Sequence, residues 1–318
     1  MIRISLVWKN GFNNRLNKLA SFLISTSLFL AISGSLKVFF SCLLFNLFIL
    51  NLILSVFFMI FSIYNLNKLT DIKEDAVNVP DRAKYIKGKE KIFIFFLLFS
   101  LTISLFLGVL QDILCVPIIL FPIFVGVIYS VRVSSNLPRL KDITGIKNLV
   151  VAITWSVGST FLPAICLPQK SNMLITLVFY FFFLKSFINT VLFDIRDIEG
   201  DRMSGVRTIP VVFGREKTKN LLLILNSTLI PWLAISYLSG FFHHYLFVLI
   251  FTIAYGYGYI LHFCKEGLKI GKSLDLIVDG EWIPVVLLCV MMQRLNLNSH
   301  YFFSLISLFK LVGLKEGS

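Results

Sequence analysis

Uninterrupted apolar segments, long enough to cross a lipid bilayer, recur along this chain from residue 19 onward. Hydrophobic residues make up 57% of the 318 positions and charged residues only 15%. The sequence has no train of alternating strands, and in lipid a helix is then the remaining way to satisfy backbone polar groups. We therefore predict an all-α, polytopic membrane protein with about nine transmembrane helices. The predicted spans are residues 19–36, 38–64, 92–110, 113–131, 148–167, 173–193, 220–239, 242–263 and 277–293.

The basic residues are distributed unevenly between the two sides of these spans. Most of the 30 Lys and Arg residues fall on the N-terminus and on the loops after the second, fourth, sixth and eighth spans. Basic loops remain in the cytoplasm, so this pattern predicts a cytoplasmic N-terminus. The net charge of +13 is then mainly a topology signal that also favours contact with anionic membrane lipid, and it does not indicate nucleic-acid binding. The sequence leaves the oligomeric state open.

The C-terminal segment is apolar but short. Its apolar part, from Tyr301, is about one turn too short for an easy crossing and carries Lys310. We predict an interfacial helix at about 299–314. No soluble domain or long linker is visible, so residues 1–318 are predicted to form a single membrane-embedded domain.

Two acidic clusters end the second and sixth predicted spans, on the same side of the membrane. Their polar side chains are spaced three or four residues apart, so on a continuous helix they stack on one face. Crowded carboxylates need cations, and hard oxygen ligands suit Mg²⁺, with Mn²⁺ as an alternative. The other interpretation is that they are solvated acids at helix ends. The candidate metal ligands are Asn67, Asp71, Asp75, Asp194, Asp197 and Asp201.

Basic residues are interleaved with the acidic clusters. The first loop continues as NVPDR, which contains Arg82, and the second as GDRMSGVRTIP, which contains Arg202 and Arg207. Such cations can hold phosphate oxygens in charge-assisted hydrogen bonds. They can equally serve only as the positive-inside signal. The candidates for a bound diphosphate are Arg82, Arg207, Lys141 and Tyr129.

Asn67-x3-Asp71-x3-Asp75 with NVPDR, followed later by DIRDIEGDRMSGVRTIP, resembles the UbiA superfamily of intramembrane prenyltransferases. The resemblance covers nearly the whole chain. It implies nine helices around a central cavity, with two Asp-rich cytoplasmic loops. It also implies that Asp71, Asp75, Asp197 and Asp201 act in catalysis, holding Mg²⁺ on a prenyl diphosphate that ionises in a dry, Phe-rich chamber. Lys68 and the segment YSVR at 129–132 depart from the commoner family pattern.

Ionisable residues also occur within or beside later spans. Lys185 lies in the middle of the sixth span, where a charged residue usually faces the bundle interior. We expect it to take part in catalysis, with Asn189 and the Asp197 cluster compensating its charge. The alternative is a lysine that snorkels to the interface. Asp275 and Asp279 repeat the four-residue spacing at the ninth span, where helix N-termini favour acids in any case.

The expected function follows from the clusters and the resemblance together. It is Mg²⁺-dependent transfer of a prenyl group from a polyprenyl diphosphate to an aromatic, quinone-type precursor or to a lipid acceptor. A membrane terpene cyclase acting on the same substrate is the alternative. A transporter is disfavoured because it needs ionisable groups at mid-membrane, and Lys185 is the one such residue seen in the spans.

Overall fold

We analysed a computed structural model of the chain, which describes residues 19, 21–70, 88–130, 145–203, 205–268 and 270–294. Within these ranges the protein is helical and contains no strand. The predicted interfacial helix at 299–314 lies outside them. The elements are α2 (Leu28–Leu44), α3 (Leu50–Thr70), α6 (Glu90–Gln111), α7 (Cys115–Ser130), α8 (Ile146–Ile165), α9 (Asn172–Arg196), α10 (Ile198–Met203), α11 (Ile209–Ser227), α12 (Leu229–Leu238), η2 (His243–Tyr245), α13 (Leu246–Phe263), α14 (Ser273–Val278), η3 (Asp279–Glu281) and α15 (Trp282–Arg294).

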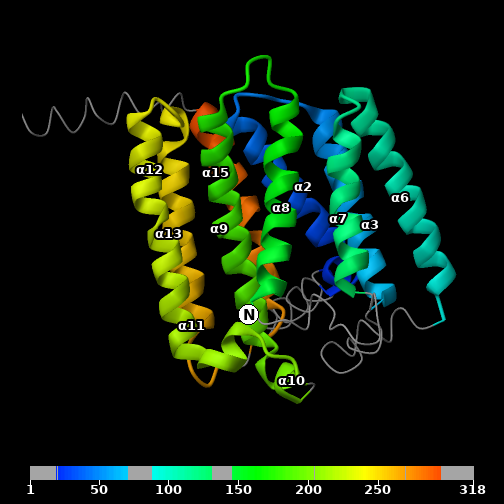
Figure 1. Cartoon of the computed structure of the whole chain (residues 1–318), viewed down its shortest axis with the longest axis vertical. Helices are drawn as coiled ribbons and strands as arrows, with labels where there is room; N and C mark the ends of the chain where they lie inside the picture. The colour runs from blue at the N-terminus through cyan, green and yellow to red at the C-terminus, as the bar shows by residue number, and fades with distance from the viewer. Residues whose placement is uncertain are drawn as a thin grey trace, which may run out of the picture.

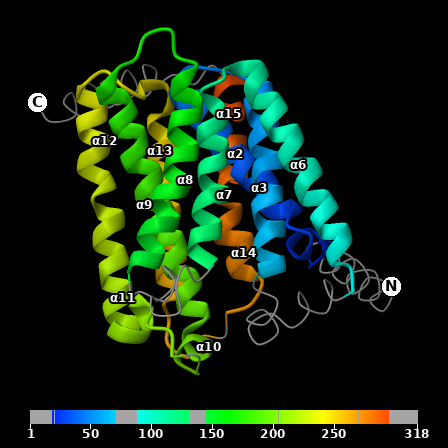
Figure 2. The ribbon, with the colours of Figure 1, turned by 45° about the vertical axis from the view of Figure 1, so that its right-hand side comes forward.

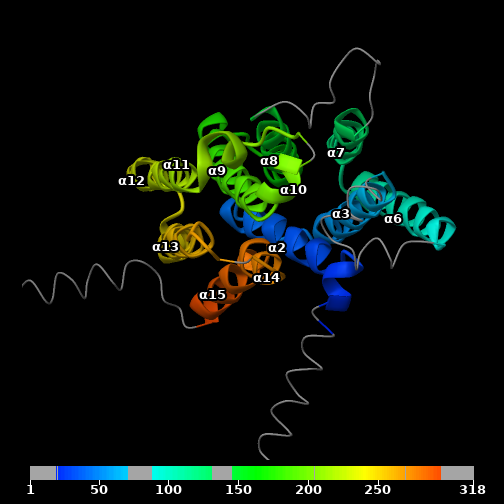
Figure 3. The same ribbon diagram turned by 90° about the horizontal axis from the view of Figure 1, so that it is seen from below.

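The long helices lie side by side and form one bundle, with the short α10 projecting at one end (Figure 1). The last turns of α3 and α9 and the start of α14 lie at this same end (Figures 1 and 2). We call it the Asp-rich end, because the two predicted acidic clusters begin in the last turns of α3 and α9 and continue beyond them in the sequence. Seen from below, α2 lies between α8 and α9 on one side and α14 and α15 on the other (Figure 3).

The apolar helices make this an integral membrane protein. Six helical segments in the described part of the chain are long and apolar enough to span a bilayer. They are Leu50–Thr70, Glu90–Gln111, Ile146–Ile165, Asn172–Arg196, Ile209–Leu238 and His243–Phe263. The helices α2 and α7 are apolar but shorter, and α15 has 13 residues. The number nine therefore stays a prediction.

The boundary between the first two predicted spans is wrong. The sequence places it at residue 37, but Lys37 lies inside α2 and the chain turns after Leu44 instead. Asn46 adopts a left-handed conformation there, with φ of 56°. Asn is one of the few residues other than Gly that tolerates this region, so it can end a helix without any charged residue. An isolated Lys was a misleading boundary signal because its charge is accommodated inside the bundle.

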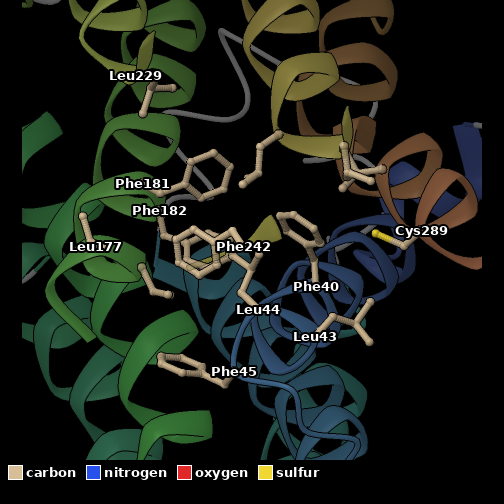
Figure 4. Packing of buried hydrophobic residues seen from close by; sticks show 14 of the residues in the cluster. Phe40, Leu43, Leu44, Phe45, Leu177, Phe181, Phe182, Leu229, Phe242 and Cys289 are labelled. Atoms are coloured by element: carbon tan, nitrogen blue, oxygen red, sulfur yellow. The ribbon is translucent and has the colours of Figure 1, made fainter. Parts of the chain in front are cut away.

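An aromatic cluster packs the end of the bundle that is remote from the Asp-rich end. Phe40 of α2 meets Phe181 and Phe182 of α9 with ring centroids 6.2 and 6.5 Å apart (Figure 4). Phe181 also stacks on Trp232 of α12 at 5.2 Å, and Phe182 lies 5.5 Å from Trp282 of α15. Edge-to-face and offset contacts of this kind add to the dispersion energy of close packing. The cluster fixes α9 against α2, α12 and α15.

Candidate active site

A cavity of about 320 Å³ opens between α2, α3, α8, α9 and the segment from α14 to α15. Its volume is within the range of small-molecule sites. One wall is apolar and includes Val56, Met59 and Ile60 of α3. Trp155 of α8 belongs to it as well and stacks on Tyr64 at 6.0 Å between ring centroids.

A second wall of the cavity is polar. It is formed by Lys37 of α2, Ser186 and Asn189 of α9, and Asp279 and Glu281 of η3. The Lys37 amine donates a 2.6 Å hydrogen bond to Ser186 Oγ and lies over the rings of Phe182 and Trp282. The cavity is therefore amphipathic and suits a ligand with an apolar chain and a polar head.

The expected Phe-rich chamber is not what lines this space. Among the Phe residues that the structure describes, Phe193 is the one that reaches the cavity. The other aromatic lining residues are Tyr64, Trp155 and Trp282. Most buried Phe side chains pack against one another in the aromatic cluster instead, because that contact excludes lipid and leaves no void.

Asp194, of the second acidic cluster, is buried and fully engaged. Lys147 donates to its Oδ1 at 2.6 Å, and Asn148 Nδ2 donates to its Oδ2 at 2.7 Å. Both partners belong to the first turn of α8, so this contact ties α8 to the last turn of α9. In this state both carboxylate oxygens of Asp194 are already paired.

Asp197 and Asp201 differ from Asp194. Asp197 caps the C-terminus of α9 and accepts hydrogen bonds from Arg196 Nε at 2.9 Å and Arg196 Nη2 at 3.3 Å. Asp201 lies on the separate helix α10, where burial raises the pKa of its carboxyl to about 6, against the opposing effect of Lys147. The prediction that Asp194, Asp197 and Asp201 stack on one continuous helix is thus wrong, because α9 ends at Arg196.

The first acidic cluster is described only at its start. Asn67 lies in the last turn of α3, half-buried. Asp71, Asp75, Arg82 and Lys141 lie outside the described residues, as does the side chain of Tyr129. Lys68 is buried beside Asn67 and donates a 2.6 Å hydrogen bond to the carbonyl of Ser25.

Of the two arginines that follow the second cluster, neither is buried. Arg202 and Arg207 are both exposed near the Asp-rich end. The structure does not place Arg207 against the cavity, whose basic lining residues are Lys37, Lys147, Lys185 and Arg196. Its role toward a diphosphate stays a prediction.

A divalent cation requires more ligands than the described residues gather at one point. No three carboxylate, His or Cys side chains in these ranges form a metal-binding group. The second cluster nevertheless offers a suitable ligand, because Asp201 is buried, lies beside the Thr208 hydroxyl and makes no ion pair within the described residues. A buried carboxylate oxygen in need of a partner suits a hard cation. The residues of the second cluster therefore fit their predicted share of the metal site.

Lys185 faces the bundle interior and does not snorkel. Its side chain is buried and its amine lies 2.5 Å from Glu281 Oε1. It also donates to Tyr259 Oη at 2.8 Å and to the carbonyl of Thr252 at 3.2 Å. The expectation that Asn189 and the Asp197 cluster compensate its charge is wrong. Spacing along one helix reveals only neighbours on that helix, whereas Glu281 comes from a distant segment.

Asp275 and Asp279 are more than acids at a helix start. Arg196 Nη1 approaches Asp275 Oδ1 at 3.5 Å, and Asn189 Nδ2 donates to Asp279 Oδ1 at 2.9 Å. Both acids line the cavity. Sequence reasoning singled out neither Lys37 nor Glu281 as a site residue. The available signal was that each is a charged residue next to or inside an apolar run.

Comparisons with known proteins show which family this chain resembles. The UbiA prenyltransferase family model matches residues 19–272. The chain is 28% identical over 212 residues to digeranylgeranylglyceryl phosphate synthase of Sulfolobus acidocaldarius, covering 66% of this chain and 74% of the relative. It is 30% identical over 193 residues to the synthase of the same name from Sulfurisphaera tokodaii, covering 59% and 66%.

Solved structures share the fold at lower identity. A UbiA homologue from Archaeoglobus fulgidus bound to DMAPP and Mg²⁺ superposes with a TM-score of 0.59 at 14% identity, covering 85% of this chain and 99% of that one. A UbiA homologue from Aeropyrum pernix gives a TM-score of 0.60 at 16% identity, covering 81% and 98%. The chain therefore belongs to the UbiA prenyltransferase family and is a membrane-embedded prenyltransferase.

Proposed function

We propose that this enzyme transfers a prenyl group from a prenyl diphosphate to the hydroxyl of a phosphate-bearing lipid, with Mg²⁺ at the Asp-rich end of the cavity. The observation that carries the choice of acceptor is the relatives' shared name. Four relatives are digeranylgeranylglyceryl phosphate synthases, a name that describes two geranylgeranyl groups on one glyceryl phosphate. The acceptor is then a glyceryl phosphate that already carries one prenyl chain.

The two walls of the cavity support a substrate of this kind. The apolar wall of α3 and α8 can accommodate an isoprenoid chain by dispersion contacts. The polar wall supplies hydrogen-bonding groups for a hydroxylated acceptor head. A wholly apolar cavity would leave that head without partners, which is costly away from water.

The Asp-rich end supports diphosphate binding. Asp197 and Asp201, with Asp71 and Asp75 from the first cluster, would hold Mg²⁺, and Asn67 and Asp194 are adjacent candidates. The bound ion supplies charge compensation to the departing diphosphate. Lys147 and Arg196 lie beside these carboxylates and provide cationic groups for phosphate oxygens. Arg82, Arg207, Lys141 and Tyr129 are further candidates for this contact.

The orientation of the site follows from the loop charges. The basic loops and the N-terminus would face the cytoplasm, which places the Asp-rich end there too. Diphosphate substrates are water-soluble at their heads, so they would enter the cavity from this side with the isoprenoid chain following into the bundle.

The proposed function can be tested by product analysis. The purified protein is incubated with geranylgeranyl diphosphate, Mg²⁺ and one of three additions: geranylgeranylglyceryl phosphate, a hydroxybenzoate, or no acceptor. Mass spectrometry should detect a prenyl ether of the lipid, and excess chelator or Asp197→Ala should abolish it. A prenylated hydroxybenzoate would replace the lipid acceptor with an aromatic one. A cyclic hydrocarbon formed at full rate without acceptor would favour the terpene cyclase.

A further inference from the structure

Asp279 lies at a level of the cavity where neither the metal nor the diphosphate is expected. Its carboxylate accepts a hydrogen bond from Asn189, which precedes Asp194 and Asp197 by five and eight residues on α9. At a rise of 1.5 Å per residue, Asn189 lies about 7.5 and 12 Å deeper along the helix than those two acids. This depth places Asp279 beneath the metal ligands, beside the space that the first carbons of the prenyl chain would occupy.

The turn that carries Asp279 is held from both sides. The Ser33 hydroxyl of α2 donates to the Asp279 carbonyl, and Lys185 of α9 pairs with Glu281, two residues further on. Gly280 between them packs against Phe29, because a Cβ built there would lie 3.0 Å from the Phe29 ring. The backbone of η3 is therefore fixed, and the Asp279 side chain has a defined position on the cavity wall.

Prenyl transfer leaves one proton to be removed, whatever the acceptor. An alcohol loses its O–H proton, an aromatic ring loses a C–H proton, and a cyclised cation loses a C–H proton. At the Asp-rich end, Asp194 and Asp197 are each paired with a cation, which lowers their basicity, and Asp201 would be taken up by the Mg²⁺ ion. A separate base at the level of the reacting carbon is needed, and a carboxylate within hydrogen-bond reach can serve.

We propose that the Asp279 carboxylate takes the proton that the acceptor loses, while Asn189 holds that carboxylate at the cavity wall. The proposal rests on the proposed prenyl transfer. The bond between C1 and the diphosphate oxygen breaks, and both electrons leave on the diphosphate. A lone pair of the acceptor hydroxyl forms the new C–O bond, and its proton passes to Asp279 and then to water at the Asp-rich end.

The charged groups around Asp279 are compatible with this role. Lys37 on α2 and Arg196 on α9 are the nearby cations, and Asp275 and Glu281 are the neighbouring acids. Glu281 is paired with Lys185, and Asp275 lies beside Arg196. Asp279 has instead a neutral amide as its hydrogen-bond donor. A carboxylate held by an amide keeps more basicity than one in an ion pair.

The test separates proton transfer from binding and from folding. Asp279→Asn is compared with wild type and with Asp112→Asn at the opposite end of the bundle, where Asp112 Oδ1 accepts from the Leu114 N–H and Asn can do the same. Geranylgeranyl diphosphate and geranylgeranylglyceryl phosphate are the substrates. We expect ether formation to fall at least about 100-fold in Asp279→Asn, the usual range for loss of a general base. Binding of a thiolodiphosphate analogue, whose bond between C1 and sulfur resists cleavage, should be unchanged.

Product partition gives the decisive readout. In Asp279→Asn we expect diphosphate release to continue, with geranylgeraniol from capture by water replacing the ether. If the variant is poorly folded, Asp279→Ala is tested instead, and added formate should restore ether formation. Ether formed at the wild-type rate would overturn the proposal, since the diphosphate itself would then accept the proton. Parallel loss of analogue binding and of ether, with no formate rescue, would also overturn it. Wild-type protein that releases no diphosphate would instead overturn the proposed function itself.

Discussion

One turn of α9 separates two buried layers of opposite character. Phe181 and Phe182 are fully buried among other rings, whereas Lys185 is equally buried but among an acid, a phenol and a backbone carbonyl. The apolar layer is held by many weak contacts, each of which can be lost alone. The charged layer, around Lys185 and Glu281, is held by a few strong contacts, and removing one partner leaves the other buried without its counter-charge. Equal burial therefore means very different tolerance to substitution.

The largest effect is expected from removing one member of the ion pair. Lys185→Met leaves Glu281 buried without its counter-charge and should destabilise the protein by about 3–5 kcal/mol. The measurement is thermal unfolding in detergent. Lys185→Met with Glu281→Gln should regain more than half of the loss, because the uncompensated charge is gone. Equal instability of the single and double variants would contradict this account of the charged layer.

The next effect concerns the hydrogen bond that joins α9 to η3 within the polar wall of the cavity. Asn189→Leu removes the donor to Asp279 and should slow ether formation about tenfold, since a hydrogen bond to a charged group contributes about 1.5–3 kcal/mol. The product should shift toward geranylgeraniol. Thr176→Val, at an exposed position of the same helix, is the control and should keep both rate and product. An unchanged product ratio in Asn189→Leu would remove Asn189 from the mechanism.

A smaller effect is expected in the apolar layer around Phe181. Phe181→Leu keeps an apolar side chain but loses ring contacts with Phe40 and Trp232, at a cost of about 1–2 kcal/mol. Activity should remain near that of wild type, because Phe181 does not line the cavity. Unfolding temperature and ether formation are measured together. A loss of activity larger than the loss of stability would show that the two layers are not independent.

The smallest effect is expected at the edge of the charged layer. Ser186→Ala removes the hydroxyl that accepts from Lys37 and should cost about 1 kcal/mol. Lys37 keeps its positions over Phe182 and Trp282, which retain part of its stabilisation. A destabilisation as large as that of Lys185→Met would indicate that Lys37 depends on Ser186 alone.

Sequence patterns predicted the parts of the molecule that depend on neighbours along the chain. The span at 173–193 lies within α9, and the inward orientation of Lys185 is confirmed. The turn after Leu44 was missed because Asn46 is its one polar residue and it carries no charged residue. Glu281 was missed as the partner of Lys185 because tertiary packing, and not sequence spacing, brings η3 to α9. The roles of Asp71 and Asp75 stay predictions.

The end of α9 at Asp197 has a consequence for how the protein handles cations. A helix C-terminus carries a partial negative charge, so the break adds to the charge of Asp194 and Asp197. Lys147 and Arg196 neutralise these two acids as resident counter-ions. A divalent ion that bound at these two acids would have to compete with both side chains, so its binding would be an exchange of one cation for another. The Lys147 and Arg196 side chains would then be free to bind the phosphate groups of the substrate, and they could return to the two acids when the product leaves.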